Sequence, residues 1–526
     1  MNKNKISLLV VFLIEILAIL LAVFGVLPRE AVLISTGIMV FYFIFSKIEH
    51  SLILFIISIP LFAAIPITES FDTMANWRIL LAILFLVWFF RRKWPQIKTQ
   101  IFSGCCSPKI RIKSNLVKWV IVFLIIGALS IFVATSSVAA IKKLLFLINI
   151  LLLFPIIKDV AKDEAQKARI NKAGIWTSII ILIIGFSQVV SVYFVPLYDF
   201  WQWWANNVIS VFYGNNLSEL LKVSNTWFAY YPDSPPTLRM FSLFPDSHSF
   251  AMSLIIGLIF LTFSAKQIHE HLSGFRSRKR AWFPISIGRA KDEILNEARR
   301  DSRGKRKDFC IWFCIVLSFI GLISSGSRGV WLSATIPFLA AIFLIIFKKE
   351  KTLKPILVLL LIFVISFPVS SLLLSKSRQD GEDATLAFKR AKSLADMDEL
   401  SVKSRMGIWE ASFESVLKHP LLGVGVGNYA VVLNEDVSAA KKGASAHNLY
   451  LDIASEMGLL GLVAFLLIFL EILRYAFKRI KVRPFMLFFL FFFSWILIYN
   501  LFDVVLFNDK VLLLFVVTIG LVYKDE

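Results

Sequence analysis

Long apolar runs separated by short polar segments occupy the chain from end to end, and 58% of its 526 residues are hydrophobic. Runs of roughly 17–22 residues recur along the chain, and at about 1.5 Å per residue an α-helix of this length can cross a hydrocarbon core of about 30 Å. The runs are continuously apolar rather than alternating, which excludes a transmembrane β-barrel. The pattern predicts an all-α polytopic membrane protein with about 14 (12–14) transmembrane helices.

The apolar runs divide the chain into five parts. We predict N-terminal transmembrane helices over 1–195, an aromatic periplasmic loop over 196–248, central helices over 249–374 with a basic cytoplasmic loop at 266–308, a large, mostly helical periplasmic loop over 375–457, and C-terminal helices over 458–526. The predicted spans are 6–27, 31–46, 51–66, 77–91, 119–134, 142–157, 174–195, 249–265, 309–324, 329–347, 355–374, 458–476, 484–502 and 510–523. The alternative for the short run at 51–66 is a re-entrant segment.

The positive charge of the chain lies mainly in short segments between the apolar runs. The formal net charge is +21, from 57 Lys and Arg against 36 Asp and Glu. Each short basic segment falls on the same side of the predicted topology, which is the positive-inside pattern and places both termini in the cytoplasm. We therefore interpret the basic excess as topology and contact with membrane lipids, not as nucleic-acid binding.

The four cysteines do not suggest a metal centre or a disulfide framework. Cys105 and Cys106 are adjacent in a basic loop, and Cys310 and Cys314 are one helical turn apart at the start of an apolar run. None of them fits a zinc-binding spacing. We expect all four to be reduced thiols on the cytoplasmic side.

The longest polar interval, within 375–457, carries the densest candidate chemistry. Apolar positions between Lys403 and Leu417 recur at helical spacing, so Arg405 and Trp409, four residues apart, share one face of a helix. Pro420 predicts the end of that helix at His419, and three glycines at 423, 425 and 427 then permit a tight backbone path.

Histidine is rare in this chain, which makes His447 a candidate general base near neutral pH. The sequence has six histidines in all, and an imidazole is the side chain whose ordinary pKa is best suited to this role. The alternative for His447 is an inert surface histidine in a loop.

Arginines from three separate segments are predicted to lie on the same outer face as His447. Arg328 begins a helix beside three serines and a glycine, where helix N-termini attract anions. Arg239 and Arg405 add further guanidinium groups, whose planar fork matches phosphate. The alternatives are a snorkelling Arg328 and a solvated Arg405. A cationic cluster with a base, located at a lipid surface, predicts a substrate that is joined to a lipid through a diphosphate.

An acidic pair, Asp396 and Asp398, has the D-x-D spacing of metal-binding soluble glycosyltransferases. Further acids stand close to it in the sequence, so we interpret the pair as a solvated acidic patch.

Several of these motifs resemble the O-antigen ligase and O-antigen polymerase family of membrane glycosyltransferases. His447-Asn448, nine residues and Gly458-x-x-Gly461 are similar to a signature of that family at full spacing. Ser327-Arg328-Gly329 resembles its Ser-Arg-Gly motif. Arg405-x-x-x-Trp409 followed by His-Pro-Leu-x-Gly-x-Gly resembles the segment before the catalytic histidine.

The segment from Arg239 to His248 is similar to an upstream arginine segment of the same family, with Ser242 where glycine is usual. The motifs cover residues 239–461, while the N-terminal spans match the family only in character.

The resemblance implies a GT-C-like, metal-independent, inverting glycosyltransferase without a cofactor, in the bacterial inner (plasma) membrane. It implies catalytic roles for His447, Arg328 and Arg405. The residues that it implies for substrate binding are Arg239, Trp409, Asn448, Gly458 and Gly461. The donor would be a glycan on undecaprenyl diphosphate, and the acceptor, at the outer face, lipid A-core or a similar glycolipid or glycan. The alternatives are a polymerase that joins lipid-linked repeat units and a transporter of the lipid-linked glycan.

Overall fold

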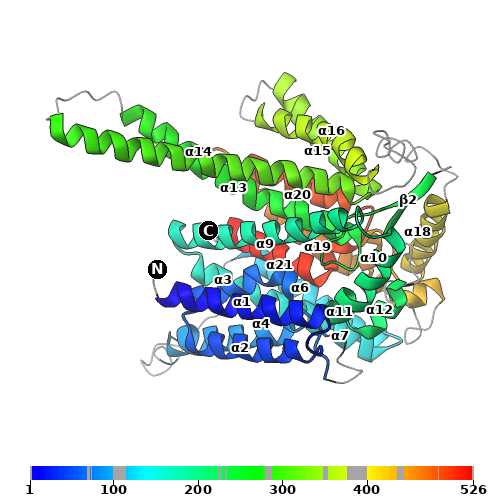
Figure 1. The fold of residues 1–526 in the computed structure, drawn as a ribbon. Coiled ribbons are helices and arrows are strands. Elements are labelled where there is room, and N and C mark those ends of the chain that lie inside the picture. The colour runs from blue at the N-terminus through cyan, green and yellow to red at the C-terminus, as the bar shows by residue number, and fades with distance from the viewer. Residues whose placement is uncertain are drawn as a thin grey trace.

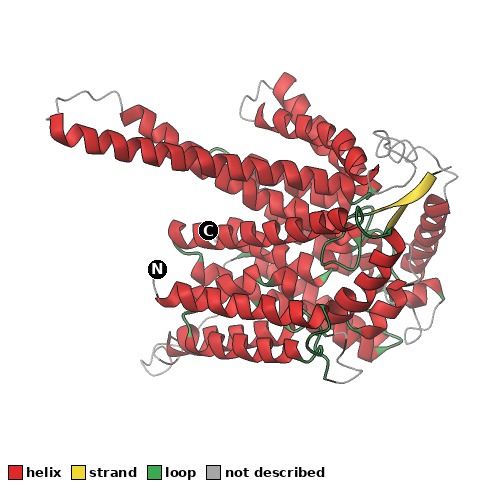
Figure 2. Cartoon of the chain, in the orientation of Figure 1, coloured by secondary structure: helices red, strands yellow, loops and turns green. Residues whose placement is uncertain are grey.

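The computed structural model describes residues 3–67, 72, 74–96, 98, 114–222, 227–231, 234–278, 287–347, 354–375, 400–434, 444–483 and 485–523. These residues form a bundle of mostly aligned helices with one short β-hairpin (Figure 2).

The N-terminal part of the bundle consists of α1 (Lys3–Val23), α2 (Ala31–Phe45), α3 (Ile48–Ile57), the 3-10 helix η1 (Ile59–Leu61), α4 (Trp77–Trp88), the π-helix η2 (Phe89–Lys93), α6 (Asn115–Ser130), η3 (Ile131–Val133), α7 (Ser137–Leu151), α8 (Leu153–Val160) and α9 (Glu164–Ser191). The aromatic region folds into α10 (Leu197–Trp203), the π-helix η4 (Trp204–Ile209), α11 (Ser210–Tyr213), α12 (Asn215–Lys222) and an antiparallel pair of strands, β1 (Phe228–Tyr231) and β2 (Ser234–Leu238).

The C-terminal part consists of α13 (Ser247–Arg278), α14 (Ile287–Ser324), α15 (Arg328–Phe347), α16 (Lys354–Ser375), α18 (Leu400–Lys418), η7 (Tyr429–Leu433), α19 (Leu449–Arg479), α20 (Phe485–Tyr499), η8 (Val505–Phe507) and α21 (Asp509–Val522). The largest buried apolar cluster joins helices from both parts, among them α3, α9, α13, α20 and α21.

The helices confirm the prediction of an all-α membrane protein. Among the described residues, nine helices are long and apolar enough to cross a membrane, judged by length and composition, and three apolar helices are shorter, namely α2, α3 and α20. Every predicted span falls on a helix, but the number of spans, 14, stays a prediction. One reason for the short helices is visible at α3, which gives way at Ser58 to a 3-10 turn that contains Pro60.

Two groups of helix ends differ from the predicted boundaries. α13 and α14 run well beyond their predicted spans, so much of the basic loop at 266–308 is helical and extends past the rest of the bundle (Figure 1). α19 begins at Leu449, nine residues before the predicted start, and is kinked at Gly458. The apolar side chains of Leu449, Ile453 and Met457 explain the early start, because all three are buried.

The two ends of the bundle carry different parts of the chain. Both termini lie at one end, while the aromatic region, β2 and α18 gather at the opposite end, which we call the site end (Figure 1). This arrangement agrees with an even number of crossings. The side of the membrane that each end faces stays a prediction.

Substituted-cysteine labelling tests which end faces outward. Leu421 follows α18 at the site end and is 65% exposed, whereas Val482 lies in the turn after α19 and is 73% exposed. In a cysteine-free background, which requires replacement of Cys105, Cys106, Cys310 and Cys314, a membrane-impermeant maleimide should label Leu421→Cys in intact cells. Val482→Cys should be labelled only after the membrane is permeabilised. The reverse pattern would contradict the predicted orientation.

Candidate functional site

His248, in the first turn of α13, contacts four different segments of the chain. Its Nδ1 lies 2.9 Å from the Ser327 hydroxyl, 3.0 Å from the Tyr499 hydroxyl and 3.2 Å from Oδ2 of Asp503. Its Nε2 lies 3.2 Å from Nη2 of Arg239. A guanidinium only donates hydrogen bonds, so Nε2 accepts and the proton of this imidazole belongs on Nδ1, facing the carboxylate.

Arg239 joins the segment after β2 to the turn between α14 and α15. Its backbone N–H donates to the Trp227 carbonyl at 2.7 Å, and its Nε donates to the Ser325 carbonyl at 2.9 Å. The side chain is buried. Arg239 is therefore brought against Ser325, two residues before the Ser-Arg-Gly motif, whereas the sequence predicted only that the two lie on the same face.

Arg328 is the first residue of α15, next to Ser327, and is partly buried. The start of this helix is held to α20, because Nε1 of Trp495 donates to the Val330 carbonyl at 3.0 Å. Its neighbour Ser327 also lies 3.0 Å from the Tyr499 hydroxyl. The Ser-Arg-Gly helix start and the end of α20 therefore form one wall of the site.

His447 lies in a short loop whose backbone is fixed from three sides. Trp409 of α18 donates its Nε1–H to the Ala446 carbonyl at 2.9 Å, the Ala446 N–H donates to Asp452 at 3.1 Å, and the Leu449 N–H donates to the Asn500 carbonyl at 2.8 Å. His447 itself has a φ of +47°, in the left-handed region that non-glycine residues seldom adopt. Such a conformation persists where surrounding contacts determine it.

The His447 side chain is 41% exposed, but its Nδ1 atom is buried and has no hydrogen-bond partner among the described residues. That atom lies 4.0 Å from Oδ1 of Asp503. Burial, and secondarily the positive charge of Arg405, lower the pKa of His447. His447 is therefore a neutral imidazole near pH 7, as a general base must be.

Asp503, in the turn after α20, places one carboxylate oxygen toward each histidine. Burial raises the pKa of Asp503 to about 6, against the opposing effects of the Val504 N–H and of the positive charges of Arg405 and Arg239. Sequence reasoning missed this residue. The available signal was its place in the short turn between the last two predicted spans, on the same face as the arginines and His447.

Three residues of the His-Asn and Gly-x-x-Gly motif have contacts typical of a scaffold. The Asn448 side chain caps α19 by accepting from the N–H groups of Tyr450 and Leu451. At the kink, Gly458 has a φ of +66°, and a Cβ there would lie 2.2 Å from the Leu421 carbonyl carbon.

A Cβ at Gly461 would lie 2.3 Å from the Cβ of Met457. Contact of Asn448, Gly458 and Gly461 with substrate stays a prediction.

A buried charge cluster formed by α7 and α19 supports the His447 loop. It was not predicted from the sequence. Lys143 of α7 lies 2.5 Å from Glu456 and 3.8 Å from Asp452, both in the first part of α19. Asp452 uses its other oxygen to accept from the Ala446 N–H. Lys143 lies within the predicted span at 142–157, and no ion pair was predicted for it.

Asp396 and Asp398, the candidate metal-binding pair, lie outside the described residues. Cys310 and Cys314 are free thiols, and Cys105 and Cys106 also lie outside the described part of the chain.

The comparisons with known proteins agree with the resemblance seen in the sequence. A family model described as O-antigen ligase matches residues 313–466. The matched region begins in α14, ends in α19 and contains Arg328, Arg405, Trp409 and His447. No curated protein matches the chain. The match supports the predicted family over residues 313–466, whereas Arg239, His248, Tyr499 and Asp503 lie outside the matched region.

Replacing Trp409 by Phe tests how the His447 loop is held. The change keeps a ring but removes the hydrogen bond to Ala446, which is worth about 1 kcal/mol, so we expect kcat for glycan transfer to fall roughly fivefold with KM nearly unchanged. Phe413→Leu, one turn later on the exposed face of α18, is the control. Equal activity of the two variants would contradict a positioning role for Trp409.

Replacing Lys143 by Met tests the charge cluster. The change leaves Asp452 and Glu456 buried without their cation, and we expect it to lower the free energy of unfolding by about 3 kcal/mol. The double variant Lys143→Met with Glu456→Gln should recover part of the loss. Denaturant unfolding in detergent measures both variants and Glu456→Gln alone, and additive losses would show that the groups do not interact.

Proposed function

We propose that this protein, whose residues 313–466 belong to the O-antigen ligase family, is a glycosyltransferase that moves a glycan from undecaprenyl diphosphate to an acceptor hydroxyl. The acceptor is lipid A-core or a similar glycolipid, and transfer takes place at the outer face of the bacterial inner membrane. The observation that carries the proposal is the meeting of Arg239 and the Ser-Arg-Gly turn with His248, Asp503 and His447 at one end of the bundle.

The arginines act on the diphosphate. A sugar–diphosphate bond breaks with negative charge building on the leaving oxygen, and preorganised guanidinium groups in a partly buried site stabilise that charge. Arg239 is held rigidly by the carbonyl of Ser325, while Arg328 lies at a helix N-terminus. In this proposal the three guanidinium groups do what a divalent metal does in other transferases, and the reaction proceeds without metal.

His447 acts on the acceptor. Its Nε2 takes the proton of the acceptor hydroxyl while the oxygen attacks the anomeric carbon and the bond to the diphosphate breaks. Attack from the side opposite the leaving group inverts the configuration. The imidazolium that forms turns its Nδ1–H toward Asp503, whose carboxylate stabilises the positive charge.

Transfer by purified protein tests the function. With undecaprenyl-diphosphate glycan and lipid A-core, the wild type should give a ligated product in the presence of a chelator, and His447→Ala should give none while folding normally. A ladder of repeat units formed without added acceptor would identify a polymerase instead. Turnover that stops in chelator would contradict the metal-independent mechanism.

The pH dependence of transfer tests Asp503. Asp503 is ionised above its raised pKa of about 6 and protonated below it, so wild-type kcat should fall as the pH drops through about 6. Asp503→Asn should lower kcat about tenfold or more at neutral pH, because the imidazolium loses its counter-charge. It should also shift the acid limb to lower pH, because the loss of the neighbouring negative charge lowers the pKa of His447 further.

Glu414→Gln, an exposed carboxylate on α18, is the control for loss of a negative charge. A limb near pH 6 that persists in Asp503→Asn would exclude Asp503 as its origin.

A further inference from the structure

His248 is an ionisable side chain of the site that takes no part in the proton transfer proposed so far. The side chain is 23% exposed. The hydroxyls of Ser327 and Tyr499, both fully buried, lie within 3.0 Å of its Nδ1 and 3.0 Å from each other. These contacts fix the ring with Nδ1 toward Asp503 and Nε2 toward Arg239. A ring held in this way can give or take a proton at a defined place.

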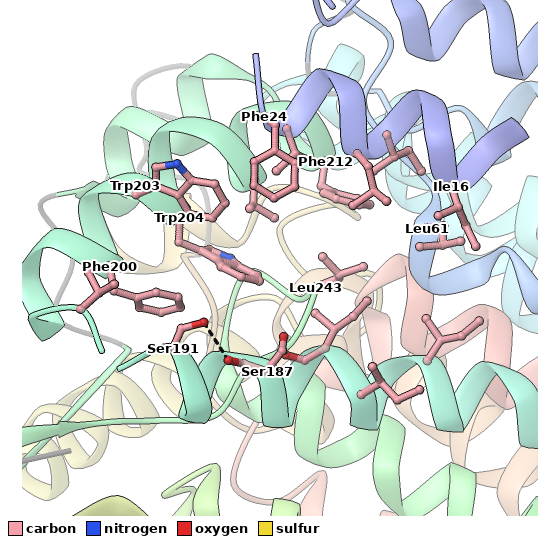
Figure 3. A pocket seen from close by; sticks show the side chains of 18 of the residues that line it. Ile16, Phe24, Leu61, Ser187, Ser191, Phe200, Trp203, Trp204, Phe212 and Leu243 are labelled. Atoms are coloured by element: carbon pink, nitrogen blue, oxygen red, sulfur yellow. Dashed lines mark hydrogen bonds between the residues drawn. The ribbon is translucent and has the colours of Figure 1, made fainter. Parts of the chain in front are cut away.

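The backbone of residues 239–248 is held as firmly as the ring. Two of its N–H groups donate to the side-chain oxygen of Gln188 on α9, at 2.8 and 3.3 Å. The Leu243 carbonyl accepts from the Tyr213 hydroxyl at 2.9 Å and from Nζ of Lys510 at 3.2 Å, and the Leu243 side chain lines the apolar pocket shown in Figure 3. Contacts from α9, α11 and α21 thus fix the spacing between the guanidinium and the imidazole at the two ends of this segment.

The Nε2 atom of His248 lies close to the place where the proposed function puts the diphosphate. It is 3.2 Å from Nη2 of Arg239, and a phosphate oxygen that accepts from a guanidinium lies about 2.7–2.9 Å from the donor nitrogen. One phosphate oxygen can therefore contact both side chains. A bound diphosphate also competes for the guanidinium and places negative charge beside Nε2, and a nearby negative charge favours the protonated form of an imidazole.

Asp503 supplies one negative charge for two imidazoles. Its Oδ2 lies 3.2 Å from Nδ1 of His248, and its Oδ1 lies 4.0 Å from Nδ1 of His447. The positive charges of Arg405 and Arg239 act on the same carboxylate, so a second imidazolium beside it would be repelled. The two rings together therefore carry one positive charge most favourably, which suits a reaction in which one ring gains a proton while the other loses one.

We infer that His248 is the general acid of glycan transfer, an inference that rests on the proposed function. His447 removes the proton of the acceptor hydroxyl while the acceptor oxygen forms its bond to the anomeric carbon. The bond from the anomeric carbon to the diphosphate oxygen breaks, and Nε2 of His248 gives its proton to that oxygen. The positive charge thus moves from one imidazole to the other across Asp503. Between turnovers, His447 releases its proton to water and His248 takes one from water.

The leaving group suits an imidazolium as its acid. The oxygen released from the anomeric carbon belongs to a terminal phosphate, whose last ionisation ordinarily has a pKa of about 6, close to the value of about 6.5 for an imidazolium. An acid whose pKa is near that of the leaving group transfers its proton at little cost. Protonation also offsets negative charge that the guanidinium groups would otherwise have to stabilise alone.

Two donor analogues with different leaving groups test the inference. Replacing the oxygen that bridges the two phosphorus atoms by CH2 makes the terminal phosphate more basic, whereas CF2 keeps it acidic, so the CH2 donor has the poorer leaving group. The measured quantity is kcat with the CF2 donor divided by kcat with the CH2 donor. In the wild type and in His419→Gln, an exposed histidine that follows α18, this ratio should be below about three. In His248→Gln it should rise at least about tenfold, because the amide cannot protonate the poorer leaving group.

The ratio is taken within one preparation, so it does not depend on the fraction of the protein that is folded. Transfer from the CF2 donor should persist in His248→Gln, and His248→Asn is the second variant if His248→Gln does not fold. A wild-type ratio in these variants would overturn the inference, and so would a variant that binds the CF2 donor but transfers from neither analogue. A wild type that transfers no glycan from the natural donor would instead contradict the proposed function.

Discussion

The carboxylate of Asp503 between two histidines is the interaction on which the site depends. One oxygen lies 3.2 Å from His248, in the first turn of α13, and the other 4.0 Å from His447, in the loop before α19. His248 in turn contacts Arg239 and Ser327. Because the carboxylate is buried among positive charges, its state of ionisation affects both imidazoles and the arginines together. Removal of this carboxylate would leave the two histidines without the negative charge that lies between them, while the Leu449–Asn500 hydrogen bond would still hold the His447 loop to the end of α20.

Two features form the scaffold around this interaction. One is a set of close backbone contacts at the kink of α19, and the other is the buried charge cluster of α7 and α19. The segment after α18 lies directly on the kink of α19, where the Leu459 N–H donates to the Pro420 carbonyl at 2.8 Å and glycine at 458 leaves room for the Leu421 backbone. The charges of Lys143, Asp452 and Glu456 tie α7 to the start of the same helix. The charge cluster also fixes the loop of His447, because Asp452 accepts from the Ala446 N–H, and the unusual backbone conformation of His447 requires such support.

The class of fold and half of the site follow from local sequence features, and the rest depends on contacts between distant segments. Continuous apolar runs predict helices wherever they occur, and the spacing of Arg405 and Trp409 predicts the face that they share. Asp503 and Lys143 belong to no motif or periodic pattern, and a lone charge beside an apolar run has many explanations. The early start of α19 was missed because residues 449–457 are mixed in polarity and are buried only by their neighbours. The motif His447-Asn448 also does not predict what each of its residues does. His447 faces Asp503, whereas the side chain of Asn448 caps α19.

The central claim is that His447 activates an acceptor hydroxyl for direct displacement of the diphosphate. The stereochemistry of one turnover tests it most directly. A donor of known anomeric configuration, labelled with ¹³C at the anomeric carbon, is transferred by the purified protein, and the one-bond carbon–hydrogen coupling of the product is measured by NMR before any further reaction. Direct displacement predicts that every product has the inverted configuration. Retention of the donor configuration would exclude a single displacement from the face opposite the diphosphate and would contradict the account.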